Sequence, residues 1–325
     1  QVDDARGLGA ARVGVFLRLR AYRRRWSTFR ICARVVCPPT RISCVCVRHG
    51  LCSIDRRSHM LSELAKFLPE IPIERALCRD IKNTDWSMPE GIQPGYWKSD
   101  RWALGPSDIE IFRSHIDCWK KISESGQIGI VLEDDLIFSE NFQDFIEILK
   151  LENLNGIIRL DGVNLPLLIN KYIKTNNKFT ISKVNSIAAS AAAYALDPVT
   201  AEKLIVNVKV ERTVDDYLFD PTPKDRGAKG HGLPIYQLEP IIAVQAQFGS
   251  YSDESRKIPA FLEVTKRVDV NYSKLRSLKG PILYRLKKEI LRIIYKHRLK
   301  KRKKYILAKM GEWREPILSK DLKWK

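Results

Sequence analysis

The chain has 325 residues, of which 44% are apolar and 29% charged. This length and composition exclude a collagen-like, mucin-like or wholly disordered chain, and they allow one large α/β domain or two average domains. No apolar run approaches the roughly eighteen residues of a spanning helix, so the sequence predicts no membrane span. The formal net charge of +19 would by itself suggest a nucleic acid or an anionic membrane as partner.

The positive charge lies at the two ends of the chain. Residues 1–57 contain thirteen Arg and three acids, a net of +10, and residues 274–304 contain fourteen Lys or Arg and one acid, a net of +13. The rest of the chain therefore has a net charge of −4 and is mildly acidic. We expect any anionic partner to bind at the ends.

The first segment also differs in composition, because all its basic residues are Arg and it holds five of the seven cysteines. We interpret residues 1–52 as an atypical Arg/Cys-rich segment that is not native or is disordered, and we assign it no function. The two other cysteines form no disulfide framework, which favours a reducing compartment. We expect a globular domain over residues 53–255 and a basic C-terminal tail over residues 256–325.

Apolar periodicity predicts alternating helices and strands through the middle of the chain. The expected helices cover 55–68, 107–123, 141–151 and a segment opening at Asp197-Pro198. The expected strands cover 128–132, 156–160, 188–196 and 233–238. This alternation predicts an α/β domain with a mostly parallel central sheet and functional residues at the carboxyl ends of its strands.

Three acids, Glu133, Asp134 and Asp135, directly follow the apolar strand 128–132. Their mutual repulsion at the edge of a sheet favours a hard divalent cation, Mn²⁺ or Mg²⁺, which in turn can hold a diphosphate. This is the logic of the D-x-D element of nucleotide-sugar glycosyltransferases, written here as Glu133-x-Asp135. A solvated turn is the alternative. A Walker-type ATPase is disfavoured, since the chain has no G-x-x-x-x-G-K-[ST].

Further blocks occur in a fixed order around this motif. They are Ser53-Ile-Asp55-Arg56-Arg57, Ser114-His115-Ile-Asp-Cys-Trp119, Leu132-Glu133-Asp134-Asp135, Ala193-Tyr194-Ala-Leu196 with Ala201-Glu-Lys-Leu204, Val214-Asp215-Asp216-Tyr217-Leu218, and Pro240 with Gln245 and Ser250–Ser252. The chain resembles glycosyltransferase family 25, the bacterial lipopolysaccharide or lipooligosaccharide galactosyltransferase group, over about residues 53–250. The family opens with a strand before the first block, whereas Arg48–Ser53 is a poor strand. If that strand is missing, the nucleotide pocket is incomplete and the chain is inactive.

The resemblance implies a GT-A-like fold that transfers a hexose, most often galactose, from a UDP-sugar with inversion and a divalent metal. It implies Asp135 as the direct metal ligand, with Glu133 and Asp134 supporting the metal or the donor ribose. An inverting attack needs a carboxylate base, for which we expect Asp215 or Asp216, with Asp161 behind them. The alternative role for the Asp215-Asp216 pair is capping of a helix after Thr213.

Other polar residues are candidates for donor contacts. Ser114 and His115 are expected to reach the donor, although His115 fits equally well as a packed core residue. Asp55 and Arg56 at a strand–helix junction suit uridine or phosphate contacts, with simple helix capping as the alternative. His231, in a glycine-rich loop, is a possible third metal ligand.

Residues 281–305 predict a basic amphipathic helix suited to an anionic lipid surface, with a solvated tail as the alternative. Nucleic-acid binding is not indicated, because no RNP, KH, zinc-finger or helix-turn-helix signature accompanies the charge. We therefore expect a cytoplasmic enzyme, peripheral to the inner face of a bacterial plasma membrane, that uses a lipid-linked oligosaccharide acceptor. The alternatives are a transferase with a protein acceptor, such as hydroxylysine in collagen, and a truncated inactive homologue that only binds membrane or nucleic acid.

Overall fold

The structure is a computed structural model of the chain. It describes residues 42–46, 54–69, 71–76, 104, 106–150, 155–170, 174–175, 177–226, 229–263, 281–309 and 311–325. The chain divides into two compact units, Gln1–Cys37 and Pro38–Lys325, and every described residue lies in the second. The predicted segment 1–52 therefore lies outside the described residues except for 42–46.

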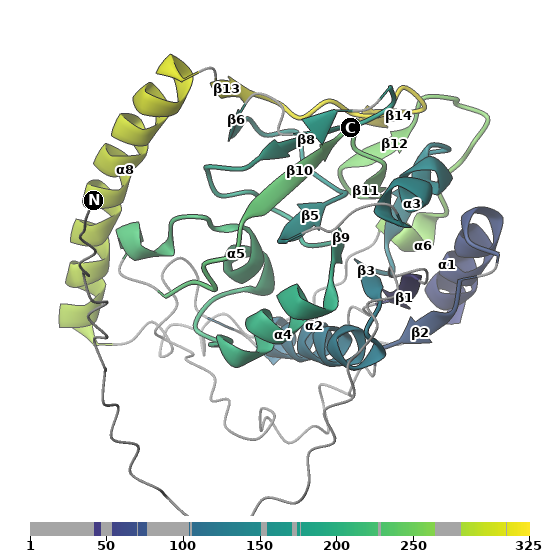
Figure 1. Ribbon diagram of the computed structural model, residues 1–325, viewed down its shortest axis with the longest axis horizontal. Helices are drawn as coiled ribbons and strands as arrows, with labels where there is room; N and C mark the ends of the chain where they lie inside the picture. Colours follow the sequence, from purple (N-terminus) through teal and green to yellow (C-terminus); the bar gives the residue numbers. More distant parts are fainter. Residues whose placement is uncertain are drawn as a thin grey trace, which may run out of the picture. The chain divides into compact units, whose positions relative to one another are not determined.

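An eight-stranded sheet forms the centre of the second unit (Figure 1). Its strand order is β2 (Ile73–Arg75), β1 (Ile42–Cys46), β3 (Ile128–Leu132), β9 (Ala193–Leu196), β5 (Ile157–Arg159), β10 (Ile235–Glu239), β8 (Thr180–Lys183) and β7 (Lys174–Thr175). Three two-stranded sheets add to it: β4 (Leu136–Phe138) with β11 (Ala243–Gln245), β6 (Leu167–Asn170) with β13 (Gly311–Arg314), and β12 (Gly249–Tyr251) with β14 (Leu322–Trp324).

The central sheet is mixed, so the prediction of a mostly parallel sheet is wrong. Strand β1 is parallel to β2 and β3, and β5 is parallel to β10. Strand β9, in contrast, is antiparallel to both β3 and β5, and β8 is antiparallel to β10 and β7. A parallel return requires a crossover, usually a helix. The described residues between β5 and β9 contain only strands and loops, so the chain returns antiparallel.

A strand precedes α1, although Arg48–Ser53 gave no sign of one. Strand β1 pairs in parallel with β3 over its full length, from Ile42 opposite Ile128 to Cys46 opposite Leu132. It lies inside the segment interpreted as non-native, several residues before the position expected from the family blocks. The apolar, β-branched run Ile-Ser-Cys-Val-Cys suits a buried parallel strand better than the segment that follows it. The reason for expecting an incomplete pocket therefore falls away.

Helices cover both faces of the sheet. They are α1 (Ile54–Phe67), α2 (Pro106–Ser125), α3 (Phe142–Lys150), α4 (Pro198–Val206), α5 (Val214–Phe219), the 3₁₀ turn η1 (Pro223–Arg226), α6 (Ala260–Glu263) and α8 (Ile282–Ala308). The predicted helices at 55–68, 107–123 and 141–151 correspond to α1, α2 and α3. Helix α4 begins as predicted at Asp197, whose carboxylate accepts a hydrogen bond from Thr200 N at 2.8 Å and caps the helix.

Strand β3 shows how the two faces divide the core. Ile128, Ile130 and Leu132 point to the face covered by α1 and α3, whereas Val131 points to the face of α2, α4 and α5. At Gly129, a Cβ atom would lie 2.2 Å from Ile122 Cγ1 of α2. Glycine here allows α2 to approach the strand closely. The acid motif follows directly from this fully buried strand.

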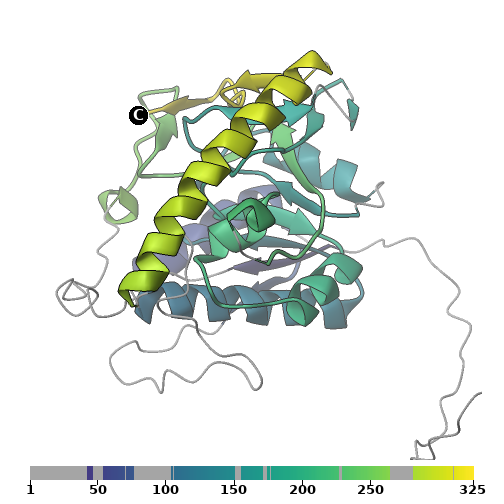
Figure 2. The same ribbon diagram turned by 90° about the vertical axis from the view of Figure 1, so that its left-hand side faces the viewer.

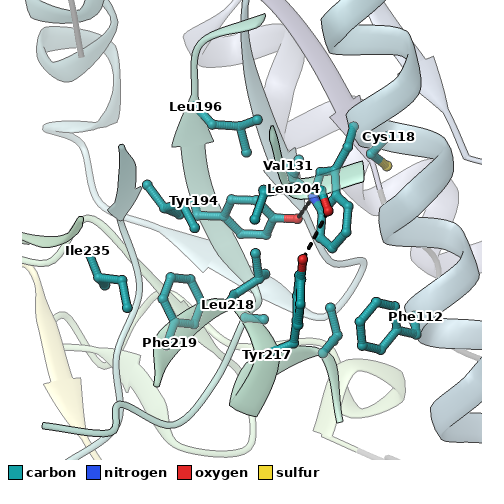
Figure 3. Packing of buried hydrophobic residues seen from close by; sticks show 14 of the residues in the cluster. Phe112, Cys118, Val131, Tyr194, Leu196, Leu204, Tyr217, Leu218, Phe219 and Ile235 are labelled. Atoms are coloured by element: carbon teal, nitrogen blue, oxygen red, sulfur yellow. Dashed lines mark hydrogen bonds between the residues drawn. The ribbon is translucent and has the colours of Figure 1, made fainter. Parts of the chain in front are cut away.

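The core on the α2 face is rich in aromatic side chains that keep their polar atoms bonded (Figure 3). The Tyr217 hydroxyl donates to Leu204 O at 2.9 Å, which ties α5 to α4. The Tyr194 hydroxyl accepts from Trp119 Nε1 at 2.8 Å, which ties β9 to α2. Because these buried hydroxyls and this indole each have a partner, the helices dock on β9 in one arrangement.

The C-terminal end of the chain returns to the domain after α8. Arg314 forms a two-point ion pair with the buried carboxylate of Glu239 at the end of β10, at 2.6 and 2.7 Å. Asp321 accepts from Ser139 Oγ at 2.8 Å. Residues 311–325 are thus bonded to residues of the predicted domain 53–255. The proposed division at residue 255 stays a prediction.

Candidate active site

The site residues gather at one edge of the central sheet. Glu133, Asp134 and Asp135 follow β3, and Asp161 follows β5, so they lie at the carboxyl ends of these strands. Because β9 is antiparallel to both, the residues that precede β9 lie at the same edge. Two backbone bonds fix this arrangement: Glu133 N donates to Ala192 O at 2.7 Å, and Leu160 N donates to Ala193 O at 2.9 Å.

Two of the three motif acids converge on a single amide nitrogen. Gln245, at the end of β11, donates from Nε2 to Glu133 Oε2 at 3.0 Å and to the two oxygens of Asp135 at 3.3 and 3.2 Å. All three side chains are buried. The pairing of β11 with β4 sets Gln245 beside Leu136 and hence next to the motif. Glu133 and Asp135 therefore share one hydrogen-bond donor, the side-chain amide of Gln245.

Asp134 points elsewhere, toward α1. Its Oδ1 lies 3.3 Å from Arg56 Nη1, and the Arg56 guanidinium also donates from Nε to Phe261 O of α6 at 3.1 Å. Both side chains of the Arg56–Asp134 pair are about nine-tenths buried. The pair therefore holds α1 and α6 against the motif, and Arg56 is not directed at an open site.

Asp161 is fully buried behind the motif. Its Oδ2 accepts from Ser190 Oγ at 2.5 Å and from Ala192 N at 3.0 Å, and its Oδ1 lies 3.8 Å from Arg159 Nη2. Burial raises the pKa of Asp161, while Arg159 and these hydrogen bonds act in the opposite direction. Ser190 Oγ also lies 3.3 Å from Gln245 Oε1. A polar chain thus runs from Asp161 through Ser190 and Gln245 to the motif acids.

His115 lies behind Glu133 in the core. Its Nδ1 is 2.7 Å from the Tyr194 hydroxyl, its ring stacks on that tyrosine, and its Nε2 is 3.8 Å from Glu133 Oε1. Burial raises the pKa of Tyr194 well above its ordinary value, so the hydroxyl stays protonated. His115 is therefore a packed core residue that lies against a motif acid, and its contact with the donor stays a prediction.

The candidate bases differ in exposure. Asp215 and Asp216 occupy the first turn of α5, and Thr213 makes no side-chain cap there. Asp216 is 1% exposed, whereas Asp215 is half-buried. Burial lowers the pKa of Arg159, and Asp161 and Asp215 both raise it, which locates Asp215 near the buried guanidinium. Asp215 is thus the more accessible of these two carboxylates.

Three predicted residues lie away from this cluster of contacts. Asp55 is exposed in the first turn of α1. Ser114 Oγ donates to Glu110 O at 3.0 Å, a bond within α2. His231 donates from Nε2 to Leu218 O and accepts at Nδ1 from Leu233 N, both at 3.0 Å. Because both ring nitrogens bond to backbone, the suggestion that His231 is a third metal ligand is wrong.

The oxygen donors of the motif bear on the fit of a divalent ion. Within the residues that the structure describes, no group of three or more His, Cys, Asp or Glu is arranged to hold a metal ion. Glu133 and Asp135 nevertheless face a common point and offer only oxygen donors, the type that Mg²⁺ and Mn²⁺ prefer. Mg²⁺ is commonly held by one or two carboxylates, with substrate phosphates and waters completing the shell. Two carboxylates therefore fit such an ion together with a nucleotide.

Comparison with known proteins identifies the family. The model of glycosyltransferase family 25, described as LPS biosynthesis protein, matches residues 52–219, more than half of the chain. The chain belongs to glycosyltransferase family 25. It is therefore a glycosyltransferase of lipopolysaccharide biosynthesis, and the matched region includes Arg56, His115, the acid motif and the Asp215-Asp216 pair.

Two other comparisons add little to the family match. No curated protein matches the chain. Among solved structures, the chain is similar to one titled mannose-1-phosphate geranyltransferase from Thermus thermophilus, with a TM-score of 0.33 and 11% identity. That similarity covers 61% of this chain and 73% of the other. At this level of similarity it carries no argument about function.

Sequence reasoning missed part of the polar cluster around the motif acids. Arg159 and Ser190 gave no signal as site residues, and Tyr194 and Gln245 were noted only as members of family blocks. Ser190 precedes a strand that the sequence analysis took to begin at residue 188, and its importance depends on the antiparallel direction of β9. Arg159 is the last residue of β5, two residues before Asp161.

Ser190 is the one non-glycine residue with positive φ, 75°, in the described part of the chain. We expect Ser190→Gly to be more stable than Ser190→Ala by about 0.5–1 kcal/mol. Both variants lose the hydroxyl that binds Asp161, but glycine escapes a left-handed strain of roughly 1–2 kcal/mol, offset by about 0.4–1 kcal/mol of unfolded-state entropy. Urea unfolding of the two variants measures the difference. An alanine variant at least as stable as the glycine variant would contradict strain at this position.

Proposed function

We propose that this family 25 enzyme transfers a hexose, galactose first among them, from a UDP-sugar to a lipooligosaccharide or lipopolysaccharide acceptor with inversion. The observation that carries the proposal is the convergence of Glu133 and Asp135 on one point at the carboxyl end of β3. A pair of carboxylates at a strand end is where a metal-bound diphosphate suits an α/β sheet. Asp215 and the Asp161–Arg159 pair at the same edge support the proposal.

Glu133 and Asp135 are the proposed ligands of Mn²⁺ or Mg²⁺. When bound, the ion supplies Lewis-acid neutralisation of the charge that develops on the departing diphosphate. Asp134 stays paired with Arg56, so its role is to fix the motif, with the donor ribose within the reach of this loop. His115 takes a positioning role, since its ring lies between Tyr194 and Glu133.

Asp215 is the proposed general base. Inverting transfer needs a carboxylate that accepts the proton of the acceptor hydroxyl as its oxygen bonds to the anomeric carbon and the C1–O bond to UDP breaks. Asp161 and Asp216 are both buried, whereas Asp215 is partly accessible. Asp161 and Arg159 instead hold the segment that precedes β9 in place.

A lipid-linked acceptor implies where the enzyme works. We propose that it acts on the cytoplasmic side of a bacterial plasma membrane, peripheral to its inner face. The concentration of positive charge in α8 supports this arrangement, because Lys and Arg near an anionic membrane surface are attracted to it.

The proposal is tested by release of UDP from UDP-galactose and other UDP-sugars by the full-length chain with Mn²⁺ and an oligosaccharide acceptor. We expect release that EDTA abolishes and that Asp135→Asn lowers about 10²-fold, the scale on which a preorganised electrostatic group acts. Asp144→Asn, which removes an exposed carboxylate paired with Lys178, is the matched control. Turnover unaffected by both EDTA and Asp135→Asn would overturn the metal assignment. Absence of UDP release from every UDP-sugar would overturn the proposed donor class.

A further inference from the structure

Helix α8 is unusual because it presents apolar side chains on two opposite faces. It has 27 residues, none of them buried. One face carries half-buried residues with helical spacing, which are Tyr284, Lys288, Leu291, Tyr295, Leu299, Arg302 and Ile306. This face meets η1, β6 and β13, and Lys303 lies over the Trp313 ring at 4.0 Å. The inward face therefore packs against the domain. Figure 2 shows α8 in front of the domain.

The opposite face, here called the outward stripe, consists of Ile282, Leu286, Ile290 and Ile293. The spacing of four, four and three residues places them in one row along the helix. They are between 57% and 72% exposed, and Leu283 and Ile294 flank them. Surface helices usually carry polar residues on the face away from the core. A row of exposed Ile and Leu therefore marks an interaction surface.

The charge of α8 selects among partners for this stripe. The helix contains eleven Lys or Arg and one Glu, a net of +10 with histidine neutral. Pairing with a second copy of α8 would bring two such charges together, and a nucleic acid would bind the charge while leaving the stripe in water. An anionic bilayer satisfies both features, because it takes apolar side chains below its headgroups and cations beside them.

We propose that the outward stripe of α8 binds the surface of an anionic phospholipid bilayer. The helix lies in the plane of the interface: the stripe inserts over its first half, and Lys300, Lys301 and Lys304 continue the same face as cations over its second half. No helix in the described part of the chain is apolar and long enough to span a bilayer. Membrane binding by the stripe does not depend on the proposed function. Only the role that we give it, which is to bring the site to a lipid-linked acceptor, rests on that function.

The test is co-sedimentation of the full-length chain with vesicles of phosphatidylcholine alone and of equal parts phosphatidylcholine and phosphatidylglycerol. We expect binding at least about tenfold tighter to the anionic vesicles. The double variant Ile290→Ser, Ile293→Ser should lower that affinity about tenfold or more, because it removes apolar groups that insert. Val206→Ser, at a similarly exposed apolar position on α4, should bind like the wild type.

Each other outcome overturns the proposal. Equal binding to both vesicles excludes an anionic surface, and unchanged affinity of the double variant excludes the stripe. A wild-type dimer in sedimentation velocity that the double variant converts to monomers assigns the stripe to a second copy. UDP release with a water-soluble acceptor is measured in parallel and should be unchanged in the double variant. A failure of membrane binding is thereby separated from a failure of the transferase proposal.

Discussion

Asp215→Asn is expected to lower the rate of sugar transfer by about 10²–10⁴-fold, the range of a general base, while donor binding stays close to that of the wild type. Asparagine keeps the shape of the side chain and removes its ability to accept a proton. The acceptor hydroxyl then has to lose its proton to water as it attacks. Because the base acts on the acceptor in the transition state, the loss falls on kcat and not on the affinity for the donor.

The location of Asp215 gives this expectation its specificity. Asp215 is partly accessible in the first turn of α5, whereas its neighbour Asp216 is 1% exposed. Asp216→Asn is therefore the matched comparison. We expect it to lower the free energy of unfolding and to lower kcat less than Asp215→Asn does. The measurement is UDP release at saturating donor and acceptor, with donor binding followed by calorimetry. Loss of kcat in a well-folded Asp216→Asn protein, with Asp215→Asn unaffected, would transfer the role of base to Asp216.

Arg159→Met is expected to lower the free energy of unfolding by about 3–5 kcal/mol, the cost of breaking a buried ion pair by removing one partner. Arg159 is 1% exposed, and its guanidinium donates to Gln237 Oε1 at 2.7 Å and to Ala189 O at 2.5 Å. It also lies over the Phe219 ring at 5.0 Å. Methionine fills similar space but leaves the Asp161 carboxylate without its cation, in surroundings where burial already raises the pKa of that acid.

The measurement is urea unfolding followed by circular dichroism, with Arg292→Met as the control. Arg292 pairs with Glu289 on the exposed surface of α8, where both side chains are more than half exposed. A pair of this kind contributes about 0–1 kcal/mol. Similar losses in the free energy of unfolding for Arg159→Met and Arg292→Met would show that the buried pair stabilises the fold no more than the exposed pair does. An Arg159→Met protein as stable as the wild type would overturn the ion-pair argument.

The secondary structure was largely accessible to sequence reasoning because periodicity reports burial. Helices α1, α2 and α3 lie within one or two residues of their expected bounds at most ends, and α8 extends three residues beyond its expected end. Asp197 capped α4 as expected. The exceptions have physical causes. Strand β9 begins at Ala193 and not at 188, since Ser190 has a positive φ and the segment before the strand bonds Asp161 through Ser190 Oγ and Ala192 N.

The site was accessible in part. The acid motif was found because three carboxylates after a buried strand are costly without a positive partner. The partner of each acid in the motif could not be predicted from the sequence. Neighbouring residues point in different directions, and the surrounding elements decide which partner each one meets. Asp134 turns to Arg56 of α1, and Glu133 and Asp135 turn to Gln245. His231, promising in its glycine-rich loop, is bonded to backbone on both nitrogens.

The sequence by itself indicated the α/β class, the run of three carboxylates that follows β3 and the concentration of positive charge at the two ends of the chain. These properties depend on local periodicity and on composition, which are read along the chain. Only the tertiary structure decided the direction of β9, the bonds that Ser190 and Gln245 make to the acids, and which face of α8 is left outward. Those properties depend on contacts between segments far apart in sequence, and no local pattern encodes which segments meet.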